Sequence, residues 1–165
     1  MTSFHEAMMD FRIQLEHGVL QQAYSGLMAY FRDLRSHFLK TYPEYKATSI
    51  YYGYMDMTYF ALIPEWLRLR RLKIAIVFEY ETFRFEVWLS GANRAVQATI
   101  WNRIQDQGWN RYRLAGDPRR EDYILSQVLS ENPDFRDLAA LTTEIEQGSL
   151  AFLQDVEIFF KSLPA

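Results

Sequence analysis

The chain has 165 residues, of which 49% are hydrophobic and 24% charged, and it contains no cysteine. This length suits a single domain, residues 1–165, that buries about 68–70% of its unfolded surface and needs no disulfide or metal to fold. The lack of cysteine excludes a disulfide scaffold, a zinc ribbon, an iron–sulfur site and a thiol nucleophile. The apolar content and the formal net charge of −3 exclude an intrinsically disordered chain.

The sequence also bears on location. No stretch approaches the roughly 18 unbroken apolar residues of a membrane span, so no membrane partner is expected. The first residues, Met1–Glu6, lack a basic region followed by an apolar core, which is not typical of a secretory signal. Together with the lack of cysteine, this predicts a cytoplasmic protein.

Two helices are expected over about residues 3–42. Four apolar residues recur at helical spacing on one face of the first helix: Phe4, Met8, Phe11 and Leu15. Gly18 ends that helix, and a second one runs from Val19 to Tyr42, before Pro43. The oligomeric state stays open.

The middle of the chain changes to a period of two, which predicts an antiparallel hairpin. Its apolar sides are Leu72, Ile74, Ile76 and Phe78, and then Phe83, Phe85, Val87 and Leu89. Tyr80-Glu81 lacks the Gly or Asn of a two-residue primed turn. A four-residue loop that pairs Glu79 with Arg84 is therefore favoured over pairing Glu79 with Thr82.

The remaining elements complete an α+β domain. Upstream we expect a strand over roughly 55–62, with another before Gly53 left open, and a short helix over 64–71 opened by Pro64. Downstream we expect a short strand or extended segment over 109–114. Helices are expected over 92–105, 121–130, 132–147 and 149–163, with Asn132 as a cap and Gly148 as a break. The predicted fold is a small antiparallel β-meander of three to four strands, about residues 50–89, packed against N-terminal helices and C-terminal helices (about 92–163).

Charge is uneven along the chain. The net charge is −2 over residues 1–65, +6 over 66–120 and −7 over 121–165. One interpretation is that the acidic C-terminal helices neutralise the basic middle. The other is an anion-binding patch, which an accessory nucleic-acid binder could use, although a pI of 5.6 lies far below the value above about 9 typical of such domains. That patch would contain Arg68, Arg70, Arg71 and Lys73, together with Arg111, Arg113, Arg119 and Arg120.

A sheet face rich in aromatic and charged residues is the leading candidate site. Its residues would be Tyr52, Tyr54 and Asp56 on one strand, and Arg84, Glu86 and Trp88 on another. Tyr and Trp offer apolar area with a polar handle, which suits recognition of a protein partner or a small ligand. The alternative is a half-buried face in which Arg84 pairs with Glu86 or Glu79 beneath a helix.

Several catalytic chemistries lack their motifs. There is no glycine-rich phosphate loop and no nucleophile elbow. His5, His17 and His37 have no second histidine four residues on, so no metal site and no cofactor are expected. A small enzyme that uses Asp56 or Glu86 as acid or base remains a third hypothesis, and it requires a carboxylate with a raised pKa inside a cleft.

Three segments resemble an uncharacterised bacterial family of about this length: Gly53–Phe60, Leu72–Phe78 and Phe83–Leu89. Leu15–Gly18 and Asn132–Phe135 fit the same family, so the resemblance spans nearly the whole chain. The family is described only as a domain of unknown function. The resemblance therefore implies a bacterial, stand-alone, single-domain protein, and it assigns no catalytic residue. The leading hypothesis is a soluble binding module.

Overall fold

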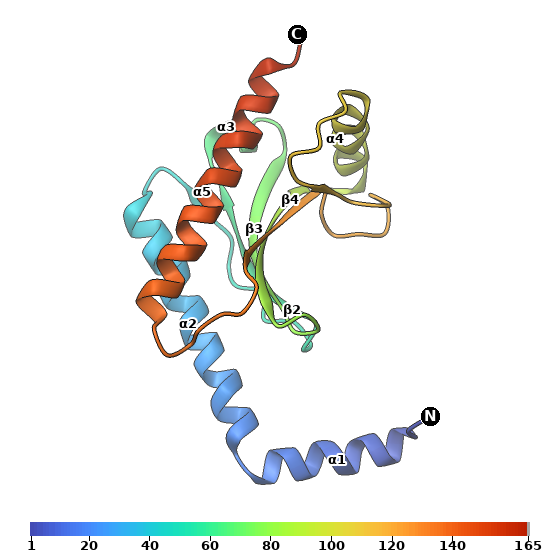
Figure 1. Cartoon of the computed structure of the whole chain (residues 1–165), viewed down its shortest axis with the longest axis vertical. Helices are drawn as coiled ribbons and strands as arrows, with labels where there is room; N and C mark the ends of the chain where they lie inside the picture. The colour runs from blue at the N-terminus through green and yellow to red at the C-terminus, as the bar shows by residue number, and fades with distance from the viewer. Residues whose placement is uncertain (165) are drawn as a thin grey trace.

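The computed structural model describes residues 1–164. Within them the fold is α+β, with five helices and six strands in one open antiparallel sheet of order β1-β2-β3-β4-β6-β5 (Figure 1). The strands are β1 Lys46–Ala47, β2 Met57–Ile63, β3 Leu72–Glu79, β4 Arg84–Gly91, β5 Arg113–Leu114 and β6 Leu125–Ser130. The helices are α1 Phe4–Glu16, α2 Val19–Thr41, α3 Glu65–Arg68, α4 Arg94–Asp106 and α5 Leu138–Ser162.

The hairpin β3–β4 is the centre of the sheet, and its predicted register is confirmed. Glu79 lies opposite Arg84 across a four-residue loop. Phe83 closes that loop with a φ of 54°, in the left-handed region. The all-apolar face of the hairpin joins the main core, as expected from its period of two.

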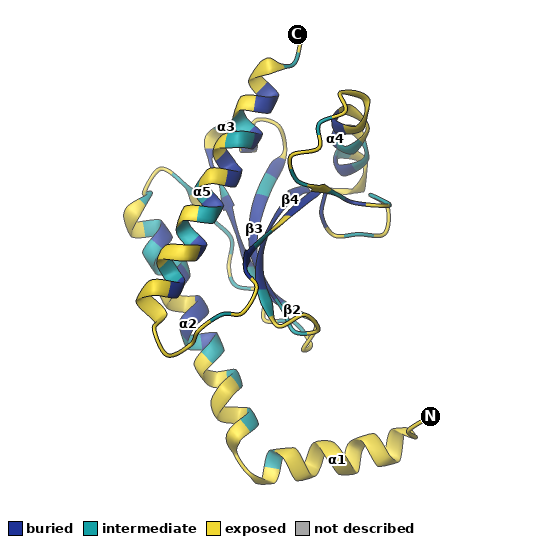
Figure 2. Cartoon of the chain, viewed as in Figure 1, coloured by how far each residue is buried: buried dark blue, intermediate teal, exposed yellow. Residues whose placement is uncertain are grey.

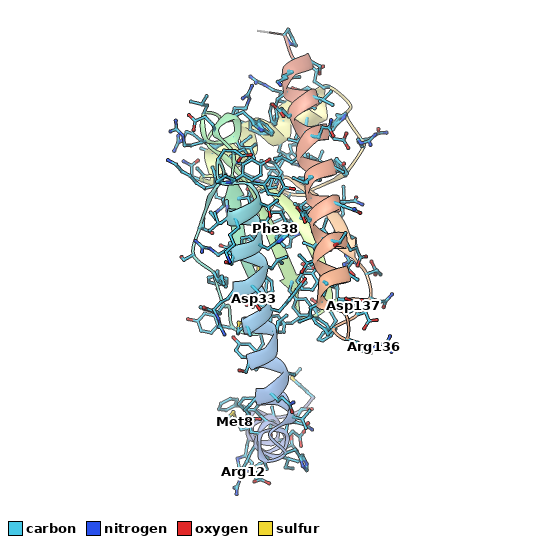
Figure 3. The ribbon with its side chains drawn as sticks, turned by 90° about the vertical axis from the view of Figure 1, so that its left-hand side faces the viewer. Met8, Arg12, Asp33, Phe38, Arg136 and Asp137 are labelled. Atoms are coloured by element: carbon cyan, nitrogen blue, oxygen red, sulfur yellow. The ribbon has the colours of Figure 1, made fainter. Side chains whose placement is uncertain are left out.

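Helices α2 and α5 lie side by side over this apolar face (Figure 3). Phe31 and Phe38 of α2 and Phe152 of α5 are fully buried there. A polar link joins the two helices, because Glu146 accepts hydrogen bonds from Tyr42 (2.6 Å) and contacts His37 Nε2 (2.7 Å). Burial is the main cause that raises the pKa of Tyr42 to about 12, and the hydrogen bond to Glu146 is the second. The phenol therefore keeps its proton and stays a hydrogen-bond donor.

The prediction of three to four strands was too low, and the predicted helix over 121–130 was wrong. Residues Leu125–Ser130 instead form β6, which pairs with β4. Ile124, Leu125, Val128 and Leu129 follow helical spacing in the sequence, which is why a helix was expected. The backbone N–H and C=O groups on the outer side of β4 need hydrogen-bond partners, and β6 supplies them. The pairing of β4 with β6 contains a register shift at Phe85/Glu86.

The predicted break at Gly148 was also wrong, since α5 is one continuous helix of 25 residues. Asp137, and not Asn132, caps it by accepting a hydrogen bond from the Ala140 amide at 3.0 Å. Gly148 allows α5 to lie close to the sheet, because a Cβ there would come within 2.6 Å of Leu129 Cδ2. A glycine inside a helix is tolerated where close packing compensates its propensity cost of about 1 kcal/mol.

The two N-terminal helices and their separation at Gly18 are confirmed. Gly18 takes a φ of 71° at the start of α2. Helix α1, however, buries none of its residues and points away from the sheet and its covering helices (Figures 1 and 2). Its apolar stripe is therefore not part of the core.

Candidate functional site

The second face of the sheet, on the side away from α2 and α5, contains a hollow of about 440 Å³. Strands β2, β3 and β4 form its floor, and the start of α4 with the loop before β6 forms its wall. The floor residues are Met57, Tyr59, Lys73, Ala75, Trp88 and Ser90. The surrounding residues are Tyr51, Gly91, Asn93, Arg94, Gln97 and Asp122.

Buried polar contacts fix the wall of the hollow. Gln97 is 4% exposed, and its side chain accepts from the Gly91 amide at 3.2 Å and donates to the Glu121 carbonyl at 2.8 Å. Ser90 Oγ donates to the Asp122 carbonyl at 2.7 Å. Gly91 must lack a side chain, because a Cβ would lie 2.7 Å from the Gln97 nitrogen. The loop is thus tied to both the sheet and α4.

Aromatic side chains shape the rest of the hollow. Tyr51 and Tyr59 form a backbone bridge, and their ring centroids lie 5.2 Å apart. Trp88 lies on β4 opposite Ala75, with its ring 5.2 Å from that of Tyr123. Tyr51 is 39% exposed and Tyr59 is partly exposed, so these two rings offer apolar surface next to polar groups, whereas Trp88 is only 6% exposed.

The hollow has two cationic residues and one anionic residue in its lining. Arg94 is held by the wall, because it donates to Asp122 Oδ1 at 3.1 Å and to the Glu121 carbonyl. Lys73 is half-buried, and within residues 1–164 it forms no ion pair. Lys73 is therefore the cation of the lining that has no protein counter-charge.

Of the six residues predicted for the sheet face, Trp88 lines the hollow and two others support it. Glu86 is 4% exposed, with Arg84 at 2.6 Å on one carboxylate oxygen and the Trp88 indole N–H at 2.7 Å on the other. Arg84 also reaches Glu131 at 3.2 Å. The alternative of an internal Arg84–Glu86 pair is thus what the structure contains.

Tyr52, Tyr54 and Asp56 do not share a strand face with them, so the expected juxtaposition was wrong. They lie in the loop before β2, where Asp56 Oδ1 accepts from the Tyr54 amide at 2.8 Å. Positive φ values at Gly53 (77°) and Met55 (62°) break the extended backbone on which alternation depends. Tyr54 is 91% exposed.

A family model described as "Domain of unknown function (DUF7000)" matches residues 4–160, from α1 almost to the end of α5. The chain belongs to the DUF7000 family. No curated protein and no solved structure matches it. The residues of the hollow all fall within the matched range.

In this DUF7000 protein neither of the two proposed catalytic carboxylates, Asp56 and Glu86, lines the hollow. Hydrogen bonds from the Tyr54 and Met57 amides lower the pKa of Asp56, which is exposed. Both oxygens of Glu86 are occupied by Arg84 and Trp88. No cluster of three potential metal ligands occurs in residues 1–164, and no helix among them could cross a membrane.

Several basic residues predicted for an anion-binding patch have acidic partners in the structure. Arg68 pairs with Glu65 at 2.6 Å, Arg111 pairs with Asp155 of α5 at 2.6 Å, and Arg119 pairs with Asp117 at 3.1 Å. Arg120 shares Asp117 at 3.6 Å. Arg70 lies 5.5 Å from the Phe160 ring centroid, and Arg113 lies 6.0 Å from that of Tyr123. Four of the eight predicted patch residues thus have an acidic partner, and within residues 1–164 the other four, Arg70, Arg71, Lys73 and Arg113, form no ion pair.

Sequence reasoning missed Tyr51, Tyr59, Arg94 and Asp122. The sequence did carry a signal for Tyr59. If β2 is taken to begin at Met57, Tyr59 and the buried Phe60 are neighbours on the strand, so their side chains point to opposite faces of the sheet. Arg94 and Asp122 carried no signal, because long-range contacts between α4 and the loop before β6 bring them together.

Proposed function

We propose that this DUF7000 protein is a binding protein, and that the hollow on the second face of its sheet takes a small organic anion with a flat apolar part. Lys73 carries the proposal, since it places a cation without a protein counter-charge among aromatic side chains. The volume of about 440 Å³ falls within the roughly 300–1,000 Å³ of small-molecule sites.

The charge of the lining favours an anion. Asp122 balances Arg94, which leaves the positive charge of Lys73. A carboxylate or phosphate placed at Lys73 would form a charge-assisted hydrogen bond, which is about twice as strong as a neutral one. A cationic ligand would meet repulsion at the same point.

The aromatic lining favours a flat ligand body. Tyr59 on the floor and Tyr51 at the side present apolar surface, and Trp88 lies almost fully buried beside them. The indole N–H of Trp88 is already bonded to Glu86, so Trp88 offers a ligand no hydrogen-bond donor. A planar group stacked there gains contact area without losing a hydrogen bond.

Native mass spectrometry of the purified protein, followed by thermal-shift titration with aromatic carboxylates and nucleoside monophosphates, tests the proposal. We expect at least one of these compounds to bind, and Lys73→Met to weaken its binding about tenfold or more. Lys40→Met is the matched control, because Lys40 is exposed on α2, outside the hollow.

Equal binding by wild type and Lys73→Met would contradict the proposal, as would a failure of every compound to bind. Trp88→Ala is a poor test, because Trp88 is 6% exposed and its removal would open a cavity. Lys73→Met keeps the length of the side chain and removes the charge alone.

A further inference from the structure

Helix α1 is an amphipathic arm without a partner in its own chain. Its apolar stripe, Phe4, Met8, Phe11 and Leu15, recurs at helical spacing, and no residue of the helix is buried. Phe4 is 82% exposed and Phe11 is 40% exposed. Figure 3 shows Met8 and Arg12 on α1, beyond the end of the paired helices α2 and α5.

The corner between α1 and α2 holds the arm away from the rest of the chain. Gly18 donates its amide to the Leu15 carbonyl at 3.1 Å, and the Gln21 side chain donates to the same carbonyl at 2.8 Å. The left-handed Gly18 then starts α2 directly. The direction of α1 is therefore set by a bonded turn of two residues, and not by a loose linker.

The same chain contains a large apolar groove. Its volume is about 630 Å³, and none of its lining residues is charged. It lies between the first half of α2, the hairpin loop and the start of α5. The main lining residues are Leu20, Ala23, Leu27, Tyr30, Met55, Phe78, Tyr80, Phe83, Phe135 and Leu138. Phe83 is 59% exposed and Leu138 is 42% exposed, so the groove presents apolar surface to its surroundings.

We infer that two copies of this chain form a twofold dimer in which the α1 arm of each lies in the groove of the other. An apolar stripe and an uncharged apolar groove are complementary, and the corner at Gly18 keeps them apart within one chain. A twofold axis makes the contact twice, with the same surfaces used by both copies.

The area of such a contact suits a stable dimer. The exposed parts of Phe4, Met8 and Phe11, with their flanks, amount to roughly 300–400 Å² when aromatic side chains supply about 150–250 Å² each. The groove has roughly half that area to lose, and the twofold axis doubles the sum. The result, about 1,000–1,200 Å², clears the roughly 1,000 Å² that a biological interface is expected to bury.

The polar side of the arm argues against a membrane surface as the occupant. It has three acidic residues, Glu6, Asp10 and Glu16, and one basic residue, Arg12, which is bonded to Glu16 at 3.0 Å. Helices that lie on membranes are rich in Lys and Arg on their polar side. An acidic helix would be repelled by anionic lipid.

Sedimentation equilibrium of the full chain over a range of concentrations tests the dimer. We expect a monomer–dimer equilibrium for the wild type and dissociation constants at least about 30-fold larger for Phe4→Glu/Phe11→Glu on the arm and for Phe83→Glu in the groove. Ile158→Glu is the control, since Ile158 is 58% exposed on α5, outside the groove, and should leave the dimer unchanged.

Leu138→Glu provides a second groove variant that should keep the fold, because an acidic residue suits the first turn of α5. Circular dichroism melting of each variant identifies any loss of structure. Mixing the arm variant with a groove variant should restore a weaker heterodimer, since one intact arm then meets one intact groove.

Three results would overturn the inference. The wild type could remain monomeric at every concentration, or a folded groove variant could dimerise as tightly as the wild type, which would mean that the arms pair with each other. Co-sedimentation of a monomeric wild type with phosphatidylglycerol–phosphatidylcholine vesicles would make the arm a membrane contact instead.

Discussion

Glu86 shows how one buried residue links the stability of the sheet to the shape of the hollow. Its carboxylate is 4% exposed and binds Arg84 through one oxygen and Trp88 through the other. A buried charge is tolerated when it is paired and fully hydrogen-bonded, as it is here. Through Trp88, this pair also sets the position of a ring in the floor of the hollow.

We predict that Glu86→Gln lowers the free energy of unfolding by about 2–4 kcal/mol, because it leaves Arg84 partly buried without its nearer counter-charge. Glu131→Gln should cost less than about 1 kcal/mol, because the Glu131 side chain is 62% exposed. Urea unfolding of the three proteins measures both effects. Similar losses for the two variants would show that Glu86 has no special role in the sheet.

At the scale of elements, the contact between α5 and β6 decides two features that the sequence pattern did not predict. Leu129 of β6 reaches the position where a side chain at residue 148 of α5 would lie. The glycine therefore acts as a contact point inside a continuous helix and not as a helix end. Through the same contact, β6 packs against α5.

We predict that Gly148→Ala lowers the free energy of unfolding by about 1 kcal/mol, because an overpacking cost of about 1–3 kcal/mol exceeds a gain in helix propensity of about 1 kcal/mol. Gly26→Ala in α2 is the control: its added Cβ would meet no atom within 4 Å, and it should stabilise the protein by about 0.5–1 kcal/mol. Denaturation at low protein concentration measures the free energy of unfolding of both variants and of the wild type.

A double-mutant cycle separates the two contributions at residue 148. In a Leu129→Ala background the space is vacated, so Gly148→Ala should become stabilising there. The explanation by close packing fails if alanine at 148 has the same effect in both backgrounds.

At the scale of the whole molecule, the unequal distribution of buried surface separates α1 from the rest. The helix has 13 residues and none of them is buried, whereas α2 buries Phe31, Leu34 and Phe38. Isolated helices shorter than about 12–15 residues are marginal in water. The capping box of Ser3 and Glu6 fixes the start of α1 but supplies no tertiary contact.

We predict that amide hydrogens of α1 exchange rapidly in dilute protein, while those of Phe31–Phe38 in α2 stay protected. If the arm docks into a second copy, protection of α1 should rise as the protein concentration is raised. Hydrogen-exchange mass spectrometry measures both segments in one experiment. Strong protection of α1 in the dilute monomer would contradict the picture of an unsupported arm.

The sequence by itself determined the elements whose signals are local. Alternation and turn chemistry predicted the β3–β4 hairpin and the pairing of Glu79 with Arg84. Gly18 and the helical spacing predicted the separation of α1 from α2. These patterns depend on neighbours a few residues apart, so they can be recognised without the fold.

Only the tertiary structure decided the rest of the sheet and the composition of the candidate site. The run 124–129 fits a helix or a strand, and the open side of β4 selects the strand. The hollow combines Tyr59, Trp88 and Lys73 with Arg94 and Asp122, which come from separate elements. Tyr52, Tyr54 and Asp56 leave the predicted face because the loop before β2 turns at Gly53 and Met55. The physical reason is that long-range pairing and packing can outweigh local propensities of about 1 kcal/mol or less per residue.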